Sequence, residues 1–197
     1  TMPFKSRSSK NYKLADWAVT AKALQRLTEQ QAKSEAQILR APPADLFEDI
    51  VGYDDVKFWL RRILSSEDPT GCLFIGPPAS AKTLLLMDIA EKMGGQYYTG
   101  TGATRRGIQR YIADMKPEIL IIDELDKLDD YSQSALLSVL ESGLVAELKV
   151  GRTSRVQYSI KVFAAGNYER NISPLLISRF RPYIFHFRPY TEAEYVD

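Results

Sequence analysis

Residues 72–83 have the sequence Cys72-Leu73-Phe74-Ile75-Gly76-Pro77-Pro78-Ala79-Ser80-Ala81-Lys82-Thr83. The first four residues are apolar and predict a buried strand, and a helix is expected to begin at the end of the stretch. A loop in this setting binds phosphate oxygens through its backbone N–H groups and the helix N-terminus. We therefore expect a phosphate-binding site formed by Gly76, Pro77, Pro78, Ala79, Ser80, Ala81, Lys82, Thr83 and Leu84.

Two residues of this loop carry the expected chemistry. Lys82 supplies a positive charge for the β- and γ-phosphates, and Thr83 offers its hydroxyl to Mg²⁺. The loop departs from the pattern G-x-x-x-x-G-K-[ST], because Ala81 occupies the position of the second glycine. Taken alone, the stretch is also compatible with a proline-containing turn before an amphipathic helix.

A second motif begins about 36 residues after the lysine, with Ile119-Leu120-Ile121-Ile122 followed by Asp123-Glu124. The continuous apolar run predicts a strand buried on both faces, and ligands bind at the carboxyl ends of such strands. We expect Asp123 to hold Mg²⁺, directly or through water, and Glu124 to orient and deprotonate an attacking water. Three further acids are expected to be solvated or helix-capping residues rather than ligands: Asp126, Asp129 and Asp130.

From Leu46 onward, short apolar runs alternate with helical stretches, which predicts an α/β fold with a five-stranded, mostly parallel sheet and crossover helices. Strands are expected near residues 72–75, 95–99, 118–123, 159–165 and 183–187, and helices near 53–64, 82–93, 107–115, 131–142 and 173–179. Between residues 144 and 161 the pattern instead predicts a β-hairpin with the polar tip Gly151-Arg152-Thr153-Ser154.

The composition excludes several classes of site and location. The 197 residues are 45% hydrophobic and 26% charged, and the net charge of +1 indicates neither nucleic acid nor membrane by itself. A single cysteine, Cys72, excludes an internal disulfide and a cysteine zinc cluster. No apolar run approaches the ~18 residues that cross a bilayer, and no signal-peptide core is present. We therefore expect an intracellular, cytoplasmic protein without a membrane partner.

With these motifs in place, the chain resembles the AAA+ ATPase superfamily over about residues 46–190. The run Phe47 to Val56 is similar to the superfamily's entry segment, which implies that Ile50, Val51 and Tyr53 lie near adenine. The run Phe163-Ala164-Ala165-Gly166-Asn167 is similar to the sensor 1 strand, which implies that Asn167 contacts the γ-phosphate and the lytic water. The resemblance implies a three-layer P-loop NTPase fold, ATP and Mg²⁺ as cofactors, and ATP hydrolysis.

The run Ser173 to Phe180 resembles the segment that carries an arginine finger. The resemblance implies that Arg179 reaches the γ-phosphate bound by a neighbouring subunit, with Arg181 as the alternative. A homo-oligomer, expected to be a ring such as a hexamer, is implied as well.

Other features are similar to one branch of the superfamily, which includes the minichromosome maintenance helicases, the MoxR-type remodellers and the RuvB-type branch-migration motors. These features are Ala81 in the loop and the hairpin before residue 161. The segment from Gly100 to Gly107 is placed like a pore loop and carries Arg105 and Arg106, while the hairpin carries Lys149, Arg152 and Arg155.

Cations directed at a pore favour DNA as the substrate, and such a protein would be nucleoid-associated or nuclear. A MoxR-like protein remodeller is the alternative, and a nucleotide-dependent scaffold with little hydrolysis is the third hypothesis. The cations are also compatible with an ordinary solvated surface.

The expected organisation has four parts. Residues 1–13 are rich in cations and serines and predict a basic mobile tail, and residues 14–44 predict a helical extension that ends at Pro42-Pro43. Residues 45–190 are expected to form the ATPase core. Residues 191–197 are expected to begin the superfamily's small helical lid, most of which this sequence does not contain.

Overall fold

The computed structural model describes the backbone of residues 41–142, 144–149, 152–157 and 159–191, and the side chains of residues 41–141 and 159–191. The expected tail, the expected helix up to residue 40 and the expected start of a lid from residue 192 lie outside the described residues.

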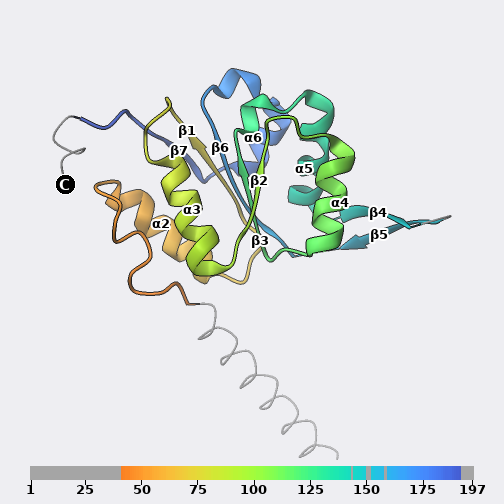
Figure 1. Cartoon of the computed structure of the whole chain (residues 1–197), viewed down its shortest axis with the longest axis horizontal. Helices are drawn as coiled ribbons and strands as arrows, with labels where there is room; N and C mark the ends of the chain where they lie inside the picture. Colours follow the sequence, from red (N-terminus) through yellow and green to blue (C-terminus); the bar gives the residue numbers. More distant parts are fainter. Residues whose placement is uncertain (1–40, 143, 150–151, 158, 192–197) are drawn as a thin grey trace, which may run out of the picture. The chain divides into compact units, whose positions relative to one another are not determined.

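Five strands form one parallel sheet (Figure 1). They are β1 (Gly71–Ile75), β2 (Gln96–Thr99), β3 (Ile119–Asp123), β6 (Lys161–Gly166) and β7 (Ile184–His186). The order β2-β3-β6-β1-β7 places β6 between β3 and β1, so the strand ends that were expected to carry the site are adjacent. β1 is buried at every position, as expected for an apolar strand covered on both faces. The predicted α/β fold with a five-stranded parallel sheet is confirmed.

Helices cover both faces of the sheet and give it three layers (Figure 1). α2 (Asp54–Ser65) and α3 (Lys82–Met93) bury Leu60 and Leu86 against one face, in a cluster that includes Phe74. α4 (Arg105–Met115), α5 (Asp130–Ser142) and α6 (Pro174–Phe180) cover the other face. Two 3-10 turns, η1 (Leu125–Lys127) and η2 (Glu169–Asn171), follow β3 and β6 and were not predicted.

The segment before α2 is fixed to the core by side chains of α2 and α3. Arg61 of α2 donates hydrogen bonds to the carbonyl oxygens of Pro43 at 2.9 Å and Ala44 at 2.8 Å. Asp88 of α3 accepts the backbone N–H of Phe47 at 2.5 Å. These contacts satisfy backbone groups that no strand or helix pairs, and they hold the entry segment next to the phosphate-binding loop.

The hairpin consists of β4 (Leu144–Lys149) and β5 (Arg152–Gln157), which are antiparallel. Figure 1 shows it beside α4 and extending away from the five-stranded sheet. The expected tip at residues 151–154 is wrong, because Lys149 pairs with Arg152 and only residues 150–151 separate the strands. A two-residue connection matches the twist of paired strands better than a four-residue tip does.

None of the helices in the described part of the chain has the length and apolar composition that would be needed to cross a bilayer.

Candidate functional site

The carboxyl ends of β1, β3 and β6 border a cavity of about 590 Å³. Every loop residue from Pro78 to Leu84 lines it, together with Asp123, Glu124 and Asn167, whereas the predicted loop residues Gly76 and Pro77 do not. These residues come from the ends of three adjacent strands, which is where open α/β sheets bind ligands. The structure therefore brings the phosphate-loop residues, the two acids and the expected sensor residue to one place.

The phosphate-binding loop contains two alanines in the left-handed region, Ala79 with φ 56° and Ala81 with φ 62°. The pattern G-x-x-x-x-G-K-[ST] has a glycine at the position of Ala81, because a Cβ in the left-handed conformation costs about 1–2 kcal/mol. Ala81 tolerates the conformation with its methyl group buried in the core cluster below α3. The alanine is thus compatible with the loop and does not abolish it.

Lys82, the first residue of α3, points back into the loop. Its Nζ donates to the carbonyl oxygens of Gly76 at 2.8 Å and Pro77 at 2.6 Å, and to Ser80 Oγ at 3.0 Å. Burial lowers the pKa of Lys82, and the negative charges of Asp123 and Asp126 oppose that shift. Phosphate oxygens that enter the loop would compete with these neutral acceptors for the ammonium group, and charge favours the phosphate.

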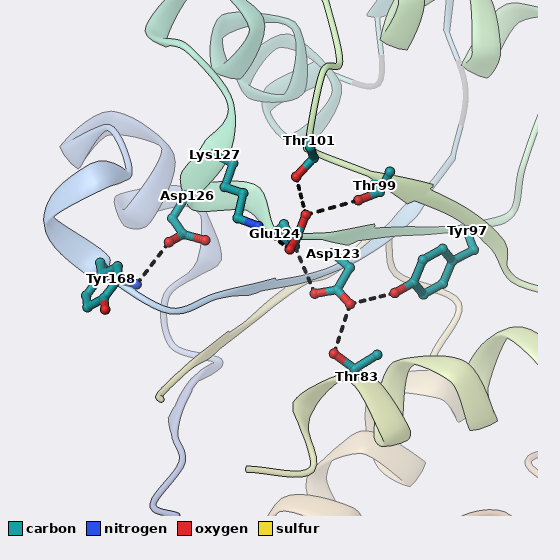
Figure 2. A network of polar contacts seen from close by, with 9 residues as sticks. All are labelled: Thr83, Tyr97, Thr99, Thr101, Asp123, Glu124, Asp126, Lys127 and Tyr168. Atoms are coloured by element: carbon teal, nitrogen blue, oxygen red, sulfur yellow. Dashed lines mark hydrogen bonds and ion pairs between the residues drawn. The ribbon is translucent and has the colours of Figure 1, made fainter. Parts of the chain in front are cut away.

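Thr83 and Asp123 both line the cavity, and their side-chain oxygens are joined by a hydrogen bond (Figure 2). Thr83 Oγ1 donates to Asp123 Oδ2 at 2.9 Å, and Asp123 Oδ1 accepts the backbone N–H of Glu124 at 2.8 Å. A hydroxyl and one carboxylate fit Mg²⁺, which is held in proteins by hard oxygen ligands, with phosphates and water completing its shell.

Glu124 is held by three side chains (Figure 2). Its Oε2 accepts hydrogen bonds from Thr101 and, at 3.4 Å, from Thr99, and its Oε1 pairs with the ammonium group of Lys127. The ion pair with Lys127 and the bond from Thr101 lower the pKa of Glu124, so the carboxylate is ionised.

The backbone of Glu124 lies against Gly100. Glu124 has φ 56°, and a Cβ on Gly100 would come within 2.3 Å of the Glu124 carbonyl oxygen. The glycine is required at that position for steric reasons.

Ile50 and Val51 of the entry segment line the cavity together with Asp49, whereas Tyr53 does not. The Tyr53 ring packs on Phe187 with centroids 4.8 Å apart, and Tyr53 Oη donates to the carbonyl oxygen of Arg188 at 2.7 Å. Tyr53 does not line the cavity itself, and it contacts Tyr190, which does.

Tyr190 lines the cavity and was missed by the sequence analysis. Its hydroxyl donates to the carbonyl oxygen of Val51 at 3.1 Å, and its ring lies 5.8 Å from that of Tyr53. No local pattern marks this residue. It reaches the entry segment because β7 returns the chain beside β1, a contact between positions 139 residues apart.

Asp126 is buried, so the expectation that it is solvated is wrong; only 8% of its surface is exposed. Its Oδ2 accepts the backbone N–H of Tyr168 at 3.3 Å, which joins η1 to the turn that follows Asn167. Its Oδ1 has no hydrogen-bond partner among the described residues. Asp129 does cap α5, as predicted, because its Oδ1 accepts the N–H of Ser132 at 2.7 Å.

Arg179 and Arg181 lie outside the cavity lining, on and just after α6. The Arg179 guanidinium forms an ion pair with Glu141 of α5 and donates to Glu141 Oε1 through Nε at 2.9 Å. Arg181 is exposed. Neither arginine lines the cavity of its own chain.

The two arginines of the expected pore loop belong to the first turn of α4, which begins two residues earlier than predicted. The reason is Thr104, which caps the helix by accepting the N–H of Gly107 at 3.2 Å. Arg105 stacks over the ring of Tyr131 at 4.7 Å and donates to Ser134, whereas Arg106 is exposed. The side chains of Lys149, Arg152 and Arg155 lie outside the described residues.

Residues 72–187 match the family described as "ATPase family associated with various cellular activities (AAA)". Replication factor C subunit 3 of Schizosaccharomyces pombe is 28% identical over 169 residues, which cover 77% of this chain and 45% of the relative. The ATP-dependent zinc metalloprotease FtsH of Acidimicrobium ferrooxidans is 28% identical over 110 residues, which cover 44% of this chain and 17% of the relative. Replication factor C subunit 3 of Saccharomyces cerevisiae is 22% identical over 179 residues, which cover 82% of this chain and 48% of the relative.

This chain spans less than half of the length of each of these relatives. The relatives support the superfamily as a whole and do not single out the branch that the sequence resembles. The family match extends from β1 past β7 and covers more than half of the chain, with the phosphate loop and both acids inside it. The chain belongs to the AAA family of ATPases.

Proposed function

We propose that this chain binds Mg²⁺–ATP in the 590 Å³ cavity and hydrolyses it to ADP and phosphate. The observation that carries the proposal is the meeting of a phosphate-binding loop, an Asp-Glu pair and Asn167 on one cavity, in a chain of an ATPase family. A loop alone would support binding only, whereas the acids add the groups that hydrolysis needs.

In this proposal, the loop of residues 76–84 holds the phosphates, with Lys82 as its positive charge. Thr83 and Asp123 hold Mg²⁺. Bound Mg²⁺ neutralises charge on the β- and γ-phosphate oxygens. Ile50, Val51 and Tyr190 enclose the base in this proposal, since they line the same cavity as the loop.

Glu124 is the proposed base for the attacking water, and it lines the same cavity as the loop. It is ionised and can accept a proton, but the hydroxyl and ammonium groups around it must first leave one of its lone pairs to water. Asn167 is proposed to orient that water, because an amide donates to phosphate and accepts from water at once.

Arg179 is proposed to complete the site of a neighbouring copy, which requires a homo-oligomer such as a hexameric ring. The proposal is supported by its place outside its own cavity and by its partly exposed guanidinium. The pairing with Glu141 would have to open, and the γ-phosphate offers the arginine a second anion of higher charge. Arg181 remains the alternative.

DNA is the proposed substrate of the motor, with a MoxR-like protein remodeller as the alternative. The name of the replication factor C relatives and the hairpin between α5 and β6 support the first, and the metalloprotease relative supports the second. Arg106 is the stronger DNA candidate of the two α4 arginines, because Arg105 is engaged by Tyr131 and Ser134.

The test is ATP turnover by this chain at low salt, with duplex, single-stranded or branched DNA added. We expect Lys82→Ala to abolish turnover and at least one DNA form to stimulate the wild type. Stimulation should fall steeply with added salt and in Arg106→Ala, because phosphate contacts release counterions. Turnover that ignores every DNA form but responds to an unfolded protein would contradict the DNA proposal. Equal turnover in wild type and Lys82→Ala would contradict the ATPase itself.

A further inference from the structure

Tyr97 makes a contact with the site that neither its sequence position nor the family match assigns. Its hydroxyl donates to Asp123 Oδ2 at 2.5 Å, the same oxygen that accepts the Thr83 hydroxyl at 2.9 Å (Figure 2). The other oxygen, Oδ1, accepts the backbone N–H of Glu124 at 2.8 Å. Three donors therefore fix the Asp123 carboxylate at both of its oxygens.

The sheet explains why a tyrosine makes this contact. β2 and β3 are parallel, with Tyr97 opposite Ile121 and Thr99 opposite Asp123. Tyr97 must therefore reach two residues along the sheet, about 7 Å, on the face that carries α3 and Thr83. A phenol is long enough for this reach, and a serine or threonine is not. Tyr111 of α4 holds the Tyr97 backbone by donating to its carbonyl oxygen at 3.1 Å.

The orientation of this carboxylate matters because aspartate turns readily about its last torsion. Thr83 has one proton to donate and lone pairs to offer, so a hydroxyl that gives its proton to Asp123 keeps its lone pairs free for a metal. A second hydrogen bond, from Tyr97 to the same oxygen, restrains rotation of the carboxylate and so keeps Oδ2 within reach of the Thr83 hydroxyl. Partners of this kind behind a metal ligand are typically worth about 10–100-fold in metal affinity.

We propose that Tyr97 is a positioning residue for the Mg²⁺ of the bound nucleotide, acting through Asp123. The role rests on the proposed nucleotide function, and it concerns the metal and not the base or the phosphates. The phenol keeps its proton at neutral pH, because the ordinary pKa of a tyrosine is about 10. It is therefore a constant donor and not a switch.

The chain offers a matched control on the next residue. Tyr98 lies on the other face of β2, where its ring packs against Tyr111 with centroids 4.9 Å apart. Tyr97→Phe and Tyr98→Phe each remove one hydroxyl from the same strand, and only the first hydroxyl donates to Asp123.

The experiment is equilibrium binding of fluorescent mant-ADP to the 197-residue chain, in excess Mg²⁺ and in EDTA. We expect Tyr97→Phe to raise the Mg²⁺ concentration at half-saturation by about 10-fold, the lower end of that range because two other donors to Asp123 remain, and to weaken binding at limiting Mg²⁺. Binding in EDTA should not change. Tyr98→Phe should match the wild type in both conditions.

Two results would overturn the role of Tyr97: an unchanged Mg²⁺ response in Tyr97→Phe, or equal weakening in Mg²⁺ and EDTA, which a general structural defect produces. A wild-type chain that binds mant-ADP in neither condition would instead overturn the proposed nucleotide function, and the role of Tyr97 with it. The two failures are therefore distinguished by the wild-type measurement.

Discussion

Glu124 precedes the turn η1 and Lys127 ends it, and the ion pair between them affects how basic the proposed catalytic carboxylate is. The pair is the largest cause of the lowered pKa of Glu124, and it raises the pKa of Lys127 in return. A carboxylate held in this way is a weaker base than a free one, because its ionised form is stabilised.

Lys127→Met should therefore raise the pKa of Glu124 and move the acid limb of the kcat profile to higher pH. Near neutral pH, basal ATP turnover should rise by about two- to five-fold, because the base is stronger and one of its oxygens is released. Steady-state turnover between about pH 3.5 and pH 8 measures both effects, because the acid limb of a glutamate with an ordinary or lowered pKa lies below pH 5. Lys127→Arg keeps the ion pair and should follow the wild type, and an unchanged acid limb in Lys127→Met would contradict this account.

Individual residues of the site differ in how far sequence reasoning could place them. Lys82, Thr83 and Asp123 were predicted because each follows a strand within a motif whose chemistry is local. Asp126 was misjudged, since its burial depends on the turn after β6, where even a Cβ on Gly166 would lie 3.2 Å from Asp126 Oδ1. Tyr190 was missed because its contact is set by the return of the chain after β7, which no short pattern encodes.

At the scale of the element, α5 carries a cap whose contribution depends on pH. Asp129 Oδ1 accepts the N–H of Ser132, and bonds from the Ser132 side chain and backbone lower the pKa of Asp129. A carboxylate with a lowered folded-state pKa stabilises the fold above the unfolded pKa of about 3.9, and this contribution is lost as the pH falls through the folded value.

Asp129→Ala should lower the urea midpoint of unfolding at pH 7, and the difference from the wild type should shrink below about pH 4. Asp129→Asn keeps a capping oxygen without the charge, so its midpoint should lie between the other two at pH 7. Urea unfolding followed by far-UV circular dichroism at the two pH values measures this. A difference between wild type and Asp129→Ala that is constant with pH would show that the charge does not matter.

The predicted elements agree with the structure where burial alone decides them. The five expected strands and five expected helices all occur, and none of their ends is shifted by more than two residues. The larger errors were at the start of α4 and in the hairpin turn. At the start of α4, the hydrogen bond to the Thr104 side chain begins the helix before its apolar pattern does. In the hairpin, the turn is set by the register of the paired strands, which the polar residues of the turn do not encode.

At the scale of the whole molecule, the proposed assembly makes one site depend on two chains. Arg179→Ala and Glu124→Gln should each reduce ATP turnover by at least about 10²-fold, the first through the finger and the second through the base. In an equimolar mixture, an Arg179→Ala chain keeps Glu124 in its site and can receive Arg179 from a neighbouring Glu124→Gln chain. Part of the activity should then return.

Turnover of the mixture, measured after the two chains have been allowed to exchange, checks this prediction. Glu124→Gln mixed with Arg181→Ala is the matched comparison, and it assigns the finger if Arg179 and Arg181 behave differently. A mixture no more active than the sum of its parts would place the arginine in its own chain's site or outside the reaction.

The sheet order has a mechanical consequence. β5 ends at Gln157, and β6 begins at Lys161 and ends at Gly166, next to Asn167, so a short connection and one six-residue strand of about 20 Å form the covalent path from the hairpin to Asn167. β6 is clamped on both sides by β1 and β3, and Lys161 at its start is tied to the end of α2 through the carbonyl oxygen of Leu64. A pull on the hairpin would load this strand in shear against both neighbours, the direction in which a ladder of hydrogen bonds yields least. A displacement of the hairpin would therefore be transmitted to Asn167 with little deformation of the strand.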